Sequence, residues 1–295
     1  DYKTIVKVAG AWATGGSINT ERRYLGSAGT QTAGIGYGGL LTPNSAVKDE
    51  TEEYNGSSWT EVGDLNTGKD QLDGCGTQTA ALAIGGRISG AVIDEVEKWN
   101  GTSWTEVGDI NDSGKGIFCL GITTAALATG GRRPGWVDSV EQYDGSTWTE
   151  IADMNTARGE HGAVGTTTAA LVATGSVSSN TENVEIWNGT SWTEVADVNT
   201  ARYDTHAAGI STSAILYAGN SGSVVAIAEQ WDGSSWTEVA DLSTARVSGG
   251  SAGTATLALA MTGSTGPNDA EASEEWNFTS TTTPPGAQNI KTITD

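Results

Sequence analysis

Aromatic residues recur along this chain at a near-constant interval. Six of them are separated by 44 or 45 residues, at Tyr54, Trp99, Tyr143, Trp187, Trp231 and Trp276. A second Trp stands five residues after each of the first five, at Trp59, Trp104, Trp148, Trp192 and Trp236. A period of this length is typical of repeat architectures, in which each unit buries its apolar face against the next unit.

One unit, from Arg158 to Val195, shows the pattern within the repeat. Short runs of small and apolar residues alternate with turns rich in glycine, which predicts strands rather than helices. We name the four runs strands a to d, at Gly159–Val164, Ala169–Ala173, Asn183–Trp187 and Ser191–Val195. Between strands c and d, Asn188-Gly189 predicts a hairpin with a type I′ turn, whose two central residues have positive φ.

The number of units predicts the architecture. A basic residue opens each of six units, at Arg22, Lys69, Lys115, Arg158, Arg202 and Arg246. A four-stranded sheet of this size cannot bury both faces alone, and closing the sheets into a ring leaves only short edges. We therefore predict an all-β fold, a six-bladed β-propeller with four antiparallel strands per blade.

The two ends of the repeat predict how the ring closes. The last unit reaches Trp276 and lacks a second Trp, whereas Trp12 precedes Arg22 by the ten residues that separate Trp236 from Arg246. The segment around Trp12 is therefore expected to be strand d of the last blade, whose other strands come from residues 246–278. Such closure replaces an exposed sheet edge with backbone hydrogen bonds.

The repeats resemble those of the Kelch family. The resemblance rests on a basic residue, a Gly-Gly doublet, an aromatic before an Asp/Asn turn and a Trp, as in Arg22, Gly38-Gly39, Tyr54 and Trp59. It covers about residues 10–278, although the doublet becomes Thr-Gly or Ala-Gly in the last three units. The amino-acid sequence of the repeats, for example Gly29-Thr30-Gln31-Thr32-Ala33, is also similar to that of Kelch-like proteins of marine tailed bacteriophages. That resemblance implies a virion-associated, extracellular protein.

Three regions follow from this pattern. Residues 1–9 form an N-terminal arm, residues 10–278 the propeller, and residues 279–295 a linker with a strand-like tail. Both arms could pair with each other or with a neighbouring chain, which would give an oligomer. The chain begins with Asp1 rather than Met, which is consistent with a processed or excised part of a longer protein.

Composition narrows the partners. The formal net charge is −21 and the pI about 4.2, which argues against a general nucleic-acid binder, whose footprint is basic. No apolar run is long enough to insert into a membrane. Counting along strand a places Cys75 and Cys119 on opposite strand faces, so two free thiols are favoured over a disulfide.

Repetition separates structural charges from candidate chemical groups. Aspartates that recur five residues after each Trp are expected to be turn residues that bind backbone amides, at Asp64, Asp109, Asp153, Asp197 and Asp241. The ring of basic residues is likewise expected to anchor the d–a loops, with binding of an anionic ligand as the alternative. The non-repeating candidates at the channel mouth are Glu160, His161, Asp204 and His206. With only two histidines we expect no metal or other cofactor, and calcium is the alternative that the acidic surface leaves open.

The b–c loops vary most between units, at residues 40–46, 87–93, 132–138, 176–182, 220–227 and 264–271. Strand alternation places them on one face with the d–a loops, and variable loops on one face usually form the binding face. Among them Arg132, Arg133 and Trp136 stand out, with Arg87 in the preceding loop, because Trp136 alone of the eleven Trp lies outside the repeat register. Trp and Arg dominate binding hot spots, although Trp136 could instead cover a blade junction.

These observations favour a non-enzymatic binding module that recognises a host-surface glycan or receptor, or another virion protein, through the b–c face. Two alternatives remain at this point. One is a structural decoration or spacer protein without a ligand. The other is an enzyme that acts on acidic polysaccharide in the channel.

Overall fold

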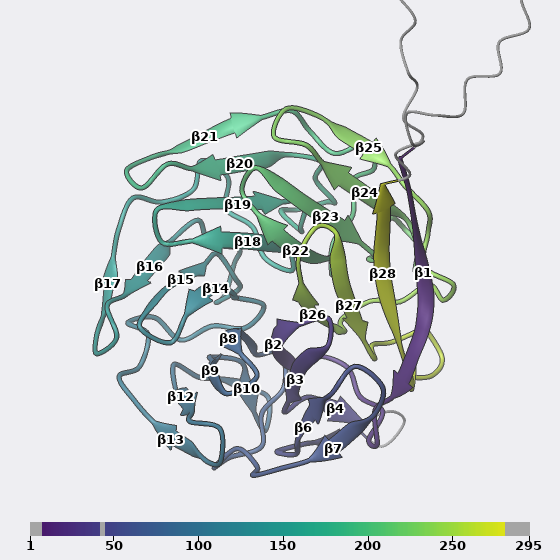
Figure 1. The fold of residues 1–295 in the computed structure, drawn as a ribbon. Helices are drawn as coiled ribbons and strands as arrows, with labels where there is room; N and C mark the ends of the chain where they lie inside the picture. The colour runs from purple at the N-terminus through teal and green to yellow at the C-terminus, as the bar shows by residue number, and fades with distance from the viewer. Residues whose placement is uncertain (1–7, 42–44, 281–295) are drawn as a thin grey trace, which may run out of the picture.

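Six four-stranded antiparallel sheets surround one axis in the computed structural model, which describes residues 8–41 and 45–280 (Figure 1). The fold is therefore all-β, a six-bladed β-propeller, as the sequence predicts. The innermost strands are β2 (Gly26–Thr30), β8 (Asp73–Thr77), β14 (Phe118–Ile122), β18 (Gly162–Thr166), β22 (His206–Ile210) and β26 (Gly250–Gly253). Within the described residues, no helix is long and apolar enough to span a membrane.

The remaining strands follow outward in each blade. The second strands are β3 (Ala33–Tyr37), β9 (Ala80–Ile84), β15 (Ala125–Thr129), β19 (Ala169–Ala173), β23 (Ser213–Tyr217) and β27 (Leu257–Met261). The third strands are β6 (Thr51–Tyr54), β12 (Val96–Trp99), β16 (Val140–Tyr143), β20 (Val184–Trp187), β24 (Ala228–Trp231) and β28 (Ala272–Ser280). The outermost are β7 (Trp59–Glu61), β13 (Trp104–Glu106), β17 (Trp148–Glu150), β21 (Trp192–Val195), β25 (Trp236–Glu238) and β1 (Val8–Ser17).

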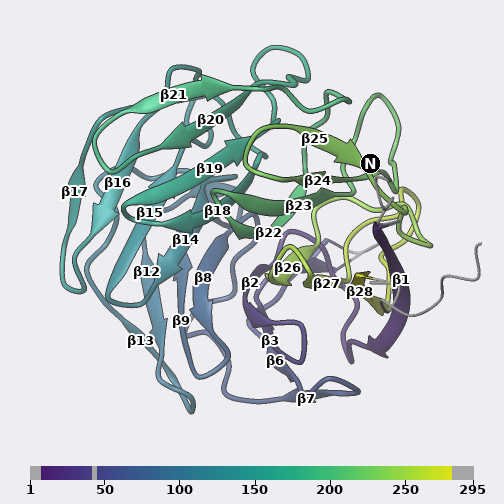
Figure 2. The same cartoon turned by 45° about the horizontal axis from the view of Figure 1, so that its top comes forward.

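The N-terminal strand closes the ring, which confirms the prediction. β1 pairs with β28 in antiparallel register and places Trp12 opposite Trp276, as Trp59 lies opposite Tyr54 in the first blade. Figures 1 and 2 show β1 beside β28 although they come from opposite ends of the chain. Of the predicted terminal arms, residues 8–9 and 279–280 belong to β1 and β28 and pair with each other, whereas the rest, residues 1–7 and 281–295, lies outside the described residues.

Aromatic pairs mark the joints between blades. Each third strand places an aromatic ring against the Trp of its outer neighbour, and the centroids of the Trp12–Trp276 pair lie 5.5 Å apart. The outer Trp also bonds to the preceding blade; for example, Trp192 Nε1 donates to the Ala152 carbonyl at 3.1 Å. Burying such large rings between sheets supplies much of the hydrophobic free energy of folding.

Two local predictions need correction. The c–d connections are four-residue loops rather than two-residue type I′ turns, because in 188–191 only Gly189 has positive φ. The Asn188 side chain accepts the Thr190 and Ser191 amides, which closes the longer loop. Strand a of the fourth blade begins at Gly162 rather than Gly159, because the preceding residues turn at the channel mouth with Glu160 at φ 55°.

The two cysteines are free, as predicted, and both are buried, but their lying on opposite strand faces does not separate them. Opposite faces of neighbouring strands a point toward each other across a blade interface. Cys75 and Cys119 therefore lie in one apolar cluster between the second and third blades, where burial raises the pKa of the Cys119 thiol.

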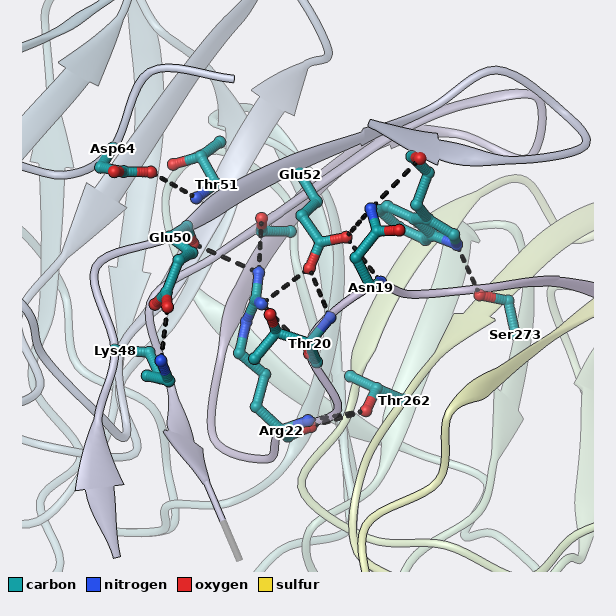
Figure 3. Close-up of polar contacts among 12 residues, drawn as sticks. Asn19, Thr20, Arg22, Lys48, Glu50, Thr51, Glu52, Asp64, Thr262 and Ser273 are labelled. Carbon is teal, nitrogen blue, oxygen red and sulfur yellow. Dashed lines mark hydrogen bonds and ion pairs between the residues drawn. The ribbon is translucent and has the colours of Figure 1, made fainter. Parts of the chain in front are cut away.

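A buried glutamate on each third strand fixes the blades to their connections. In the first blade, Glu52 accepts hydrogen bonds from the Asn19 backbone and side-chain amides, both at 2.7 Å (Figure 3). It also pairs with Arg22 at 2.9 Å. The same position is occupied by Glu52, Glu97, Glu141, Glu185, Glu229 and Glu274, each at most 5 % exposed.

The basic ring is therefore structural, with one correction. Arg22, Lys69, Arg158, Arg202 and Arg246 are buried and each pairs with the glutamate of its own blade. In the third blade the equivalent residue is Gly114, and Lys115 stands one position later, outside the ring and half-buried. Three of the repeating aspartates are shown in the expected role: Asp64, Asp109 and Asp241 accept backbone amides of the third strand at 3.3, 3.2 and 3.3 Å.

We expect that deleting residues 1–16 lowers the melting temperature or causes aggregation, because it removes β1 and exposes the edge of β28. Differential scanning calorimetry measures this, with deletion of residues 1–7 as the control that keeps β1. A variant without residues 1–16 that melts like the full chain would contradict the closure.

We expect Glu185→Ala to destabilise the fold by about 3–5 kcal/mol, since it leaves the buried Arg158 charge without its partner. Glu194→Ala, on the exposed side of β21, should change stability by less than about 0.5 kcal/mol. Chemical denaturation compares the two, and equal effects would show that the buried pair is not a stabilising joint.

Candidate functional site

The d–a and b–c loops meet on one face of the propeller, as predicted, and form a short row of cross-strand neighbours in each blade. We call these six triplets the rim rows. They are Arg23–Leu40–Val47, Asp70–Arg87–Val92, Lys115–Arg132–Trp136, Gly159–Ser176–Asn180, Tyr203–Asn220–Val224 and Val247–Ser264–Asp269. The backbone pairing repeats from blade to blade while the side chains do not, so the rim rows are the variable surface of a constant frame.

The rows of the second and third blades differ in one charge. Asp70 lies opposite Arg87 in the second blade, and two hydrogen bonds of 2.9 Å join the carboxylate to the guanidinium. In the third blade, Lys115 lies opposite Arg132, two positive groups in the same register. Like charges directly opposite each other are destabilising. Among the described residues, neither of these two cations forms an ion pair.

Trp136 completes the third row and is held on both sides. The Arg132 guanidinium lies over its ring, 5.1 Å from the centroid. Beyond the ring lies Gly159 of the next row, where an added Cβ would come within 2.6 Å of the indole. Trp136 therefore packs at a blade junction, which is one of the two roles expected of it, and it also supports Arg132, which is exposed.

The other two predicted binding residues, Arg87 and Arg133, are engaged in ion pairs and so are less available to a ligand. Arg87 is fixed by Asp70, and Arg133 forms an ion pair of 2.7 Å with Asp112 of the neighbouring d–a loop. Arg87 still contributes its charge to the third row, because it and Arg132 add to burial in lowering the pKa of Lys115. Three cations thus converge beside the channel mouth of a strongly acidic protein.

A ring of left-handed residues encircles the channel mouth. One residue per blade has positive φ, at Tyr24, Gln71, Gly116, Glu160, Asp204 and Ser248. Backbone hydrogen bonds link neighbouring members; the Gln71 amide, for example, donates to the Tyr24 carbonyl at 3.0 Å. Non-glycine residues adopt this conformation at a cost of order 1–3 kcal/mol each, so the frame must hold them there.

Below this ring lies a small cavity. The centres of water molecules can occupy about 110 Å³ of it, which is room for a small water cluster. Glu160 and Asp204 line the cavity together. Burial, reinforced by the neighbouring charge of Glu160, raises the pKa of Asp204 to about 7, and burial also raises the pKa of Glu160.

The two histidines do not form a pair. His206 lines the cavity, but its Nε2 accepts the Gly249 amide at 3.0 Å. His161 is fully buried outside the cavity lining, with its ring against Phe118 and Nε2 2.9 Å from Thr129 Oγ1, so the prediction that it belongs to the mouth is wrong. Burial lowers the pKa of both imidazoles to about 3.

No cluster of three or more His, Cys, Asp or Glu that could hold a metal ion occurs among residues 8–41 and 45–280. Sequence reasoning missed two sets of residues that matter more. The buried glutamates stand two residues before each repeating aromatic, a spacing visible in the sequence. The basic residue stands three positions after an asparagine in other units, as Lys69 does after Asn66. The same count from Asn111 reaches Gly114, so Gly114 belongs to the ring position and Lys115 is left for another role.

We expect Asp204→Asn to stabilise the protein more at pH 8 than at pH 4.5. Because the folded-state pKa of Asp204 is raised to about 7, its protonated carboxyl favours the folded state. This contribution to stability is fully present below the unfolded pKa of about 3.9 and is lost as pH rises through about 7. The neutral amide of Asn does not ionise and so avoids this loss. The gain in stability at pH 8 should therefore exceed the gain at pH 4.5 by at least about 1 kcal/mol, since one pKa unit corresponds to about 1.4 kcal/mol. Denaturation at both pH values measures it, and an equal effect at each would refute the shift.

Comparison with known proteins offers no relative from which to assign the site. A scan of protein-family models finds none that matches the chain, and no curated protein matches it. The assignment therefore rests on the geometry of the rim rows and the cavity.

Proposed function

We propose that this chain is a non-enzymatic binding module that recognises its partner through the rim rows, centred on Arg132 and Trp136. One observation carries the proposal. The repeating glutamates of the frame are bound by the asparagine or serine of their own connection, whereas the third row presents an exposed guanidinium supported by an indole. Preorganised Arg and Trp side chains are typical of binding hot spots, because little entropy is lost when they bind.

The biological setting is a further part of the proposal. The repeats resemble Kelch repeats, and their amino-acid sequence is similar to that of Kelch-like phage proteins. Both resemblances support a Kelch-type propeller in a bacteriophage virion, at the tail, fibre or capsid. A host-surface glycan or receptor, or another virion protein, is then the expected partner. The acidic surface favours solubility in salt and disfavours nucleic acid.

An enzyme that acts on polysaccharide is the second candidate, and the pair Glu160 and Asp204 favours it. Carboxyl groups whose pKa values are raised by burial often serve as acid or base in catalysis. Release of reducing sugar from host polysaccharide, lost in Asp204→Asn, would support this candidate. A structural spacer without a ligand predicts neither binding nor turnover.

We expect Trp136→Ala to weaken attachment to host cells or to a partner protein at least about tenfold, because Arg132 loses its support. The melting temperature should fall only modestly, since the indole is half-buried and packs against Gly159 of the next rim row rather than within the apolar clusters between the sheets. Val92→Ala, at the equivalent position of the second row, is the matched control. Unchanged attachment with a large loss of stability would show that Trp136 serves packing alone, and the proposed site would have to move.

A further inference from the structure

The third rim row differs from the second by a reversal of charge, and this difference suggests what the site binds. In one register, the second blade places Asp70 beside Arg87 and the third blade places Lys115 beside Arg132. Two backbone hydrogen bonds, of 3.2 and 2.8 Å, hold Lys115 and Arg132 opposite each other, so the two side chains leave the backbone at neighbouring positions. An acceptor that is part of the fold in the second row has no counterpart in the third.

We propose that Lys115 and Arg132 form a subsite for a single oxyanion, the carboxylate or sulfate of an acidic saccharide, with Trp136 as the positioning residue for Arg132. A planar guanidinium matches the two oxygens of such a group, and an ammonium adds a point charge. The ligand's oxyanion thus takes the place that the Asp70 carboxylate has in the second blade. This inference rests on the proposed binding function and names its ligand class.

The surroundings favour a saccharide with few charges over a polyacidic peptide. Next to Lys115 along the chain, Gly116 belongs to the mouth ring, and Tyr24, Glu160, Asp204 and Ser248 line the same cavity. Their hydroxyl and carboxyl groups can hydrogen bond to sugar hydroxyls. A peptide with many carboxylates would instead meet Glu160 and Asp204 and a protein of net charge −21.

Four charged groups act on Lys115. Arg87 and Arg132 oppose its positive charge, whereas Glu160 and Asp70 favour it. Asp70 is already bound by Arg87, which leaves Glu160 as the acid that competes with an incoming anion. Because burial raises the pKa of Glu160, its protonation as pH falls should strengthen anion binding, and Glu160→Gln should bind more tightly than the wild type at pH 8 and show a smaller pH dependence, of which Asp204 retains a part.

NMR titration of the full chain tests the subsite with two sugars that differ in one group, methyl glucuronide and methyl glucoside. Glucose 6-sulfate tests the second oxyanion, and a pentaglutamate peptide tests the protein alternative. We expect the wild type to bind the glucuronide and the sulfate at least tenfold more tightly than the glucoside. Equal affinity for the charged and neutral sugars, or tighter binding of the peptide, would overturn the inference.

The decisive variant is Lys115→Asp, which builds the second-blade pair into the third blade. It should abolish binding of the acidic sugars while the melting temperature stays equal or rises, so loss of fold cannot explain the result. Arg132→Met should weaken binding at least tenfold. Arg23→Met, the same position as Lys115 in the first row, should change affinity less than twofold.

The outcomes separate this inference from the proposed function. Retained binding of acidic sugars in Lys115→Asp overturns the subsite. Binding of a neutral glycan or a protein that depends on Trp136 also overturns it, but leaves the binding module standing. Absence of any binding that depends on the rim rows overturns both.

Discussion

The buried glutamate of each third strand is the constraint on which the propeller depends. In the first blade, Glu52 belongs to β6 while its partners Asn19 and Arg22 lie on the connection that enters from the last blade. Each glutamate therefore joins a sheet to its incoming loop, and the joint is repeated in all six blades. A charge in this position is stabilised by the several hydrogen bonds that the carboxylate accepts and, in five of the six blades, by a facing cation, which would be left as an unpaired buried charge if the glutamate were removed. The third blade shows the frame's tolerance, since Glu141 keeps the Asn111 amides while Gly114 replaces the cation.

This frame separates the residues that build the protein from those that remain for recognition. The aromatic pairs, the glutamates and the mouth ring repeat because each blade must solve the same packing problem. The rim rows share a backbone pattern but impose no side chain, so they can change without loss of the fold. The third row uses that freedom most, placing a lysine, an arginine and a tryptophan side by side. Its position next to the carboxyl groups of the cavity gives the face both cationic and acidic hydrogen-bonding groups.

Periodicity alone predicted the blade count, the aromatic pairs and the closure by Trp12, because these depend on spacing along the chain. It failed where a partner comes from another blade. The cysteines were assigned to opposite faces correctly, yet opposite faces of neighbouring strands meet across the blade interface. His161 and His206 differ by one position in their units. Because successive residues of a strand point to opposite faces, His161 lies in the core and His206 lines the cavity. Arg132 and Trp136 were found because they break the repeat, whereas Lys115 was hidden by a one-residue shift in register.

In our proposal, the third rim row holds an anion where the second row holds its own carboxylate. Anomalous diffraction from crystals soaked in selenate, a sulfate analogue with a strong signal, tests this. We expect a peak between the Lys115 ammonium and the Arg132 guanidinium, absent at the equivalent place beside Arg87 and absent in Lys115→Asp. No peak at the third row, or the same peak in Lys115→Asp, would contradict it.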